Sequence, residues 1–159
     1  MAKVEVLAGM ISSGKSTYAA QRAEDGAIVI NGDAIVLAVH GGDYSLYDDS
    51  IKSLYKTVGL AIFSHAAALG RDVVVDQTCL TRKTRATWVN LARQFGLDSV
   101  VVEFEQFEPD IHARRRMSAD SRGYTYEQWK SVAQRHHEEY EPVLKNEGYD
   151  SYELKEWND

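Results

Sequence analysis

A glycine-rich run near the start of the chain has the residue types and spacing that bind phosphate. The segment GMISSGKST, residues 9–17, matches the pattern G-x-x-x-x-G-K-[ST] at every fixed position. Its glycines let backbone N–H groups turn inward around a phosphate chain, and a following helix adds partial positive charge. We expect Lys15 to reach the β- and γ-phosphates of ATP or another nucleoside triphosphate, and Ser16 to hold Mg²⁺. The predicted nucleotide-binding residues in this run are Ile11, Ser12, Ser13, Gly14, Lys15, Ser16 and Thr17.

Two aspartates follow strand-like runs and are candidates for a catalytic or metal-binding role beside this loop. Asp33 follows the apolar run 27–30, and a carboxylate there can accept a proton from an attacking hydroxyl. The alternative is that Asp33 only caps the next helix. Asp76 ends the run of valines 73–75, a Walker-B pattern that predicts a Mg²⁺ contact, although Asp76 could equally orient the acceptor or bond the backbone of the loop.

Basic residues gather in two segments of a chain that is acidic as a whole. We interpret residues 110–124 as a helical lid whose Arg122, and next Arg116, grip the donor phosphates, with Gly123 as a hinge. The other segment holds Arg82 and Arg85, which follow Asp76 and are predicted to receive an anionic acceptor. For both segments a solvated basic surface is the alternative.

The elements that must position these residues alternate along the chain. Strand-like runs occur at 4–8, 27–30, 73–75 and 100–104, and each is short and apolar, as in a sheet covered on both faces. Amphipathic helix patterns cover residues 15–23, 51–69, 88–95 and 125–140. Alternating strands and helices predict an α/β fold in three layers, with a parallel sheet of about four or five strands. We expect residues 1–159 to form one domain, whose tail after Gly148 adds a strand or packs against the body.

Composition excludes several classes of protein. The chain has 159 residues, 44% of them hydrophobic and 26% charged, which is typical of a globular domain rather than a fibrous or disordered one. No apolar run approaches the roughly 20 residues of a membrane span, so no membrane partner is expected. The formal charge of −6 argues against broad binding to duplex nucleic acid, and the single cysteine fits a cytoplasmic setting.

Other residues with reactive or aromatic side chains are weaker candidates. His136 and His137 lack partners at metal-ligand spacing, so packing is favoured over a zinc site. Cys79 has no paired histidine motif that would make it a nucleophile. The tyrosines between residues 43 and 55 either stack on a base or cover the core.

The order of these motifs resembles the kinase module of bacteriophage-type 5′-polynucleotide kinases and, more broadly, small P-loop kinases of the AAA type. The resemblance extends from residue 4 to residue 142. It implies that Asp33 is the general base for a 5′-hydroxyl and that Arg122 clamps the donor phosphates. It also implies that Asp76 and Thr78 border the acceptor pocket. The expected substrate is then the 5′ end of DNA or RNA, with any phosphatase or ligase partner on a separate chain.

Two departures from that family fall on the acceptor side. The family often has an arginine shortly after the base, where this chain has the apolar residues 34–37, and Cys79 follows Thr78 where relatives tend to have asparagine. Three alternatives therefore stay open: a kinase for a small metabolite, nucleoside or nucleotide, a non-catalytic nucleotide switch, and a toxin-type kinase that acts on a cell-wall precursor.

Overall fold

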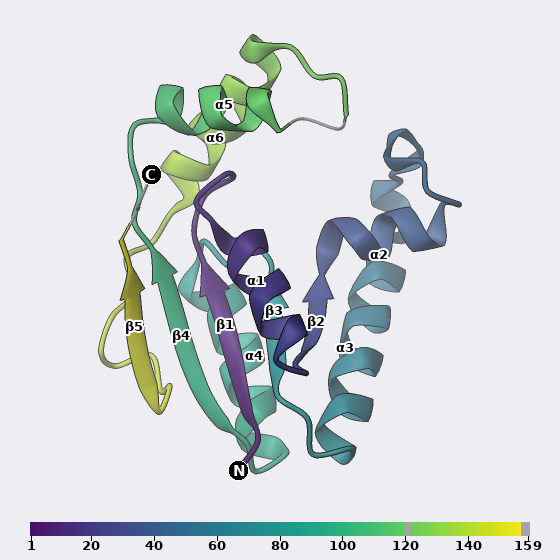
Figure 1. Ribbon diagram of the computed structural model, residues 1–159, viewed down its shortest axis with the longest axis vertical. Helices are drawn as coiled ribbons and strands as arrows, with labels where there is room; N and C mark the ends of the chain where they lie inside the picture. Colours follow the sequence, from purple (N-terminus) through teal and green to yellow (C-terminus); the bar gives the residue numbers. More distant parts are fainter. Residues whose placement is uncertain (120–121, 157–159) are drawn as a thin grey trace.

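A sheet of five parallel strands forms the centre of the computed structural model, which describes residues 1–119 and 122–156 (Figure 1). The spatial order of the strands is β2-β3-β1-β4-β5, so the strand that leads into the glycine-rich run lies in the middle. This confirms the predicted α/β class and the predicted number of strands. The strands are β1 (Lys3–Ala8), β2 (Ile28–Asn31), β3 (Val73–Asp76), β4 (Asp98–Phe104) and β5 (Ser151–Lys155).

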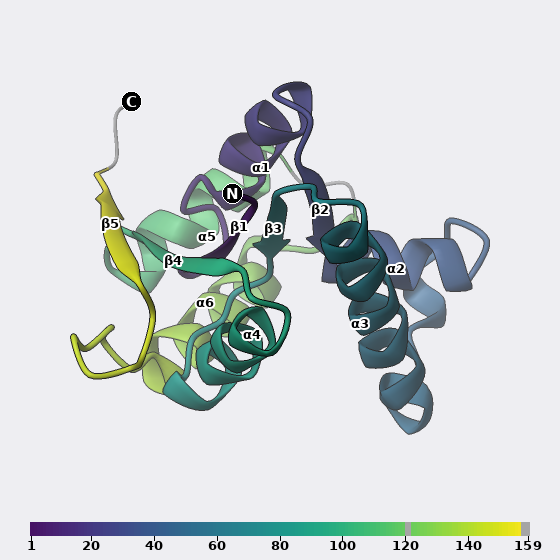
Figure 2. The ribbon, with the colours of Figure 1, turned by 90° about the horizontal axis from the view of Figure 1, so that it is seen from below.

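Helices cover both faces of this sheet, which gives three layers. Helix α1 (Lys15–Glu24) packs on one face, and α3 (Lys52–Ala68) and α4 (Arg82–Gln94) pack on the other (Figure 2). Because successive strand residues point to opposite faces, Val4 and Val6 join the core under α3 and α4, whereas Leu7 joins the core under α1. Burial on both faces explains why the strands read as apolar runs.

The carboxyl ends of the strands meet at one edge, where the functional residues gather. Asn31 pairs with Asp76 across β2 and β3, and Gly9 follows β1 directly beside them. Helices α5 (Pro109–Ser118) and α6 (Tyr126–Glu139) pack against each other above this edge, as Figure 1 shows. Thr125 and Gln128 form the predicted capping box at the start of α6.

Two parts of the fold go beyond the sequence-based expectations. The tail returns as β5, parallel to β4, so its strand alternative is confirmed. Helix α2 (Gly32–Val39) begins directly after β2, and two short 3₁₀ turns, Tyr44–Leu46 and Asp49–Ile51, lead from it to α3. Within the described ranges, no helix is both long enough and apolar enough to cross a bilayer.

Candidate functional site

The glycine-rich run forms a tight loop between β1 and α1. Gly14 has φ of +102° and Ser12 has φ of +53°, both in the left-handed region. A Cβ atom on Gly9 would lie 2.7 Å from Ser13 Oγ and 3.1 Å from Phe104 Cβ, so a larger residue there would require both side chains to shift. The loop therefore has the backbone shape and the helix N-terminus that a phosphate chain requires.

Lys15 is buried inside this loop. Its Nζ donates to the carbonyl oxygens of Gly9 and Met10, at 2.8 and 2.5 Å, and to Ser13 Oγ at 3.3 Å. Burial lowers the pKa of Lys15 to about 8, although the nearby negative charges of Asp76 and Asp33 oppose that shift. The ammonium group is thus held among acceptors that a phosphate oxygen can replace.

Asp76 joins β3 to the loop and to β2. Its Oδ2 accepts hydrogen bonds from Ser16 Oγ at 3.1 Å and from Asn31 Nδ2 at 2.8 Å. Asp76 and Ser16 thus present two hard oxygen ligands side by side, which is the donor set that Mg²⁺ prefers. The residues present fit the magnesium site that the sequence predicts.

Asp33 lies in the first turn of α2 but does not cap it. Asn31 takes the capping role, because its Oδ1 accepts from the Ala34 N–H at 2.8 Å. The carboxylate of Asp33 is instead 58% exposed and accepts a hydrogen bond from Arg122 Nη2 at 2.6 Å. It is therefore available to a molecule that enters beside the loop.

The lid arginines rest on aromatic rings. The guanidinium of Arg122 lies 3.7 Å from the ring centroid of Tyr44 and 5.4 Å from that of Trp129, and the guanidinium of Arg116 lies 4.7 Å from the Trp129 centroid. Trp129 is almost fully buried in α6. Such cation–π contacts hold the two arginines over the same edge of the sheet.

A pocket of about 430 Å³ opens beside Asp33, between α2, α3 and α4. Aromatic and aliphatic side chains make up most of its lining, among them Tyr44, Tyr47 and Trp88. Tyr47 stacks between Tyr44 and Tyr55, and the three tyrosines form a wall of the pocket, while Tyr55 also packs against the core. Gln77 and the exposed lysines Lys52 and Lys56 add polar groups.

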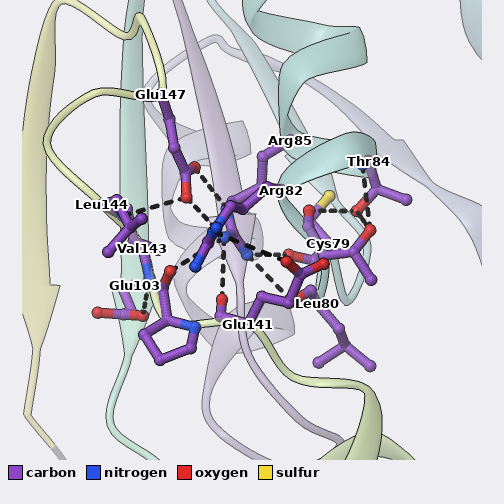
Figure 3. Close-up of polar contacts among 12 residues, drawn as sticks. Cys79, Leu80, Arg82, Thr84, Arg85, Glu103, Glu141, Val143, Leu144 and Glu147 are labelled. Carbon is purple, nitrogen blue, oxygen red and sulfur yellow. Dashed lines mark hydrogen bonds and ion pairs between the residues drawn. The ribbon is translucent and has the colours of Figure 1, made fainter.

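The prediction that Arg85 binds the acceptor is wrong. Arg85 is fully buried, and its Nε and Nη2 donate to the carboxylate of Glu147, each at 2.8 Å (Figure 3). Its Nη1 donates to the carbonyls of Cys79 and Leu80, and its Nη2 also donates to that of Glu141. Arg85 thus fastens residues 141–147 to α4 and has no contact with the crevice.

Three further residues considered from the sequence lie between the end of β3 and the start of α4. Arg82 is half exposed and lies 3.7 Å from Glu141, so its acceptor role stays a prediction. Thr78 contacts the phosphate loop through its backbone, since its carbonyl accepts from the Gly9 N–H at 2.9 Å, and its place beside the acceptor stays a prediction. Burial raises the pKa of Cys79 to about 12, which keeps it an unreactive thiol.

Sequence reasoning missed the residues that brace the loop and the lid from a distance. His136 and His112 both bond to Ile11 of the loop, and Trp129 supports the arginines. The helical spacing of Trp129, Ala133 and His136 predicted a packed face, which it is, but gave no sign of what that face covers. Of the loop residues predicted to bind nucleotide, Ser13 is buried with Lys15 and Thr17 is exposed on α1.

The fold is shared with solved structures of two kinases and of one further protein that binds a nucleotide. A gluconokinase from Sinorhizobium meliloti 1021 is 22% identical, with a TM-score of 0.60 over 97% of this chain and 82% of that one. The APS kinase CysC of Mycobacterium tuberculosis, solved with AMPPNP and APS, is 20% identical, with a TM-score of 0.53 over 96% and 88%. Chaetomium thermophilum Kti12, solved with ADP-AlF3, is 16% identical, with a TM-score of 0.63 over 98% and 90%. At these identities the likeness concerns the fold.

Comparison with families gives a firmer assignment than these structures do. No curated protein sequence matches the chain significantly. The model of one family, described as the AAA domain, matches residues 4–143, which include the phosphate loop, both aspartates and the lid. The chain belongs to this AAA domain family and has the P-loop kinase fold.

Proposed function

We propose that this protein is an ATP-dependent kinase that phosphorylates a hydroxyl group of a small molecule. The observation that carries the proposal is the pocket of about 430 Å³ with Asp33 on its wall, beside a phosphate-binding loop. Pockets of this size hold a metabolite or a nucleoside. The proposal includes a cytoplasmic setting, which the single cysteine favours.

On the donor side, the chain has residues suited to each requirement of phosphoryl transfer. Lys15 and the N–H groups at the start of α1 would bind the phosphates of ATP, and Ser16 and Asp76 would hold Mg²⁺, which neutralises charge on the phosphates. Arg116 and Arg122 would stabilise the negative charge of the transferring group.

On the acceptor side, Asp33 would orient the hydroxyl and accept its proton. The residue is exposed to the pocket and carries no capping duty, since Asn31 has taken it. The apolar residues Ile35 and Val36 follow Asp33 on the same pocket wall, where the family that the sequence resembles often has an arginine to hold an acceptor phosphate. The aromatic lining favours an acceptor with a planar or apolar body, and a nucleoside has that character.

A second candidate acceptor is the 5′ end of a nucleic acid, as the family resemblance implies. Lys52 and Lys56 favour it, because both line the pocket, are exposed and could pair with a phosphate next to the reacting sugar. In that case the protein would act in end repair, with a phosphatase or ligase on another chain.

The test is transfer of labelled γ-phosphate from ATP to three acceptor sets: nucleosides, hydroxylated metabolites such as sugar acids, and 5′-hydroxyl oligonucleotides. We expect labelling within the first two sets, with loss of transfer in both Asp33→Asn and Lys15→Ala. Exclusive labelling of oligonucleotides would establish the second candidate instead. If ATP binds but no acceptor is labelled, and Asp33→Asn does not change the rate of ATP hydrolysis, the protein is a nucleotide switch. That result would overturn the kinase proposal.

A further inference from the structure

Both peptide groups that flank the Cα of Ile11, in the middle of the phosphate loop, are bonded to a histidine. The Ile11 N–H donates to His136 Nδ1 at 3.2 Å, and the Ile11 carbonyl lies 2.8 Å from His112 Nδ1. His136 comes from α6 and His112 from α5. Both are buried, with 7% and 0% of their surface exposed. The loop is thus tied both to α5, which belongs to the lid, and to α6, which follows the lid.

The partners of each ring fix its tautomer. A carbonyl can only accept, so His112 must donate from Nδ1, and its Nε2 then accepts from the Phe107 N–H at 3.1 Å. His136 accepts at Nδ1 and therefore carries its hydrogen on Nε2. Each ring is neutral, which agrees with burial lowering the pKa of both to about 4.

These bonds act on the part of the loop that sets its shape. Ile11 immediately precedes Ser12, whose φ of +53° turns the chain, and follows Met10, whose carbonyl holds Lys15. At the other end of the same helices, Arg116 lies on α5 and rests on Trp129 of α6. A shift of α5 or α6 would therefore move the loop backbone and the arginine together.

We propose that His112 and His136 are positioning residues that hold the phosphate loop in its binding shape and in register with the lid. The inference rests on the proposed function only in that the loop binds a nucleotide. A neutral imidazole suits the task, since it supplies one donor and one acceptor without placing a further charge beside Lys15. Histidines that merely fill space would leave nucleotide affinity unchanged when an apolar side chain replaced them.

The experiment compares three variants of α6 by the affinity for ATP-Mg²⁺, measured calorimetrically without an acceptor. In His136→Asn the side-chain oxygen lies near the place of Nδ1 and keeps an acceptor for Ile11, whereas His136→Leu removes it. We expect His136→Leu to weaken binding about ten-fold, as loss of a buried hydrogen bond does, and His136→Asn to recover most of it. His137→Leu, at the exposed neighbouring position, is the matched control and should bind as the wild type does.

A second measurement follows the Ile11 amide itself. Its hydrogen exchange in the free protein should accelerate in His136→Leu and return toward the wild-type rate in His136→Asn. Equal ATP affinities and equal Ile11 exchange in the wild type, His136→Asn and His136→Leu would overturn the proposal. If His136→Leu fails to fold, His136→Gln replaces it, because the glutamine amide reaches the place of Nε2 and not that of Nδ1. An ATP affinity of His136→Gln equal to that of His136→Asn would then overturn the proposal. Failure of every acceptor to become labelled would defeat the proposed function alone, since neither measurement here requires an acceptor.

Discussion

Arg122 Nη2 donates to Asp33 Oδ2 at 2.6 Å, joining the lid to the acceptor side of the site across 89 positions of sequence. The same guanidinium stacks on Tyr44 at the pocket wall. If Arg122 binds the donor phosphates as proposed, a phosphate and the Asp33 carboxylate compete for one arginine. In the proposed kinase, ATP binding would draw Arg122 from Asp33 and leave the carboxylate to the acceptor hydroxyl.

Replacing Asp33 with asparagine should abolish proton acceptance while preserving the size of the side chain. We expect kcat for phosphoryl transfer to fall roughly 10²- to 10⁴-fold, the usual contribution of a general base. The affinity for ATP should not fall and should rise to the extent that Asp33 competes for Arg122. Steady-state kinetics and calorimetry would measure the two quantities. Asp98→Asn, an exposed change at the amino end of β4 and away from the site, should leave both as they are, and an Asp33→Asn enzyme with wild-type kcat would refute the assignment.

Arg122→Lys should lower the activity of the proposed kinase even though it keeps the positive charge. An ammonium group lacks the planar fork that pairs with phosphate and stacks on Tyr44. We expect kcat/KM for ATP to fall by at least about ten-fold. Arg114→Lys provides the comparison, because Arg114 is exposed and pairs with Asp110 in its own helix; equal effects of the two changes would show that Arg122 has no special role.

The affinity for ATP should decline in alkaline solution. Burial lowers the pKa of Lys15 to about 8 in the free protein, so the side chain loses its charge above that pH, whereas bound phosphate favours the charged form. Binding above pH 8 must then take up a proton, and affinity should fall by up to about ten-fold per pH unit. Calorimetry in buffers of different ionisation enthalpy would detect the uptake, and Lys15→Arg, charged throughout, should show a flatter dependence.

Stability should fall on the acid side for a different reason. Burial lowers the pKa of His112 and His136 from 6.5 to about 4, so the unfolded chain binds more protons than the folded one between these values. The free energy of unfolding should therefore decrease as the pH falls from about 6.5 to about 4. Urea unfolding of the wild type beside the double variant His112→Asn/His136→Asn would test this, since the variant should lose most of that slope.

Arg85→Met should destabilise the protein without altering the site. Removal of one partner of a buried ion pair leaves Glu147 charged and uncompensated, which typically costs about 3–5 kcal/mol. Denaturant unfolding would measure the loss, and Arg85→Met/Glu147→Leu should recover part of it. The folded fraction should retain its KM for the acceptor, whereas a raised KM would restore Arg85 to the acceptor site.

The parts of the site that could be predicted from sequence are those whose chemistry lies in contiguous residues. The loop shape, the place of Lys15 and the carboxylate after β3 all follow from a glycine pattern and from strand ends that share one edge. The acceptor role predicted for Arg85 was wrong because the sequence shows its basic neighbours but not its partner. That partner, Glu147, lies 62 positions away. The bonds from Ile11 to His112 and His136 cross 101 and 125 positions, and a single sequence gives no sign of such pairings.

The place of β1 in the middle of the sheet bears on how the chain is made. Among the five strands of this sheet, β1 is translated before the others, and its two neighbours, β3 and β4, come from segments translated much later. Until Phe104 has emerged, the glycine-rich run cannot acquire its native flanks, and until α6 has emerged it lacks the histidine that holds Ile11. A nascent chain should therefore remain open to trypsin at Lys15 until α6 has emerged, and ATP would act as a folding ligand only after that point.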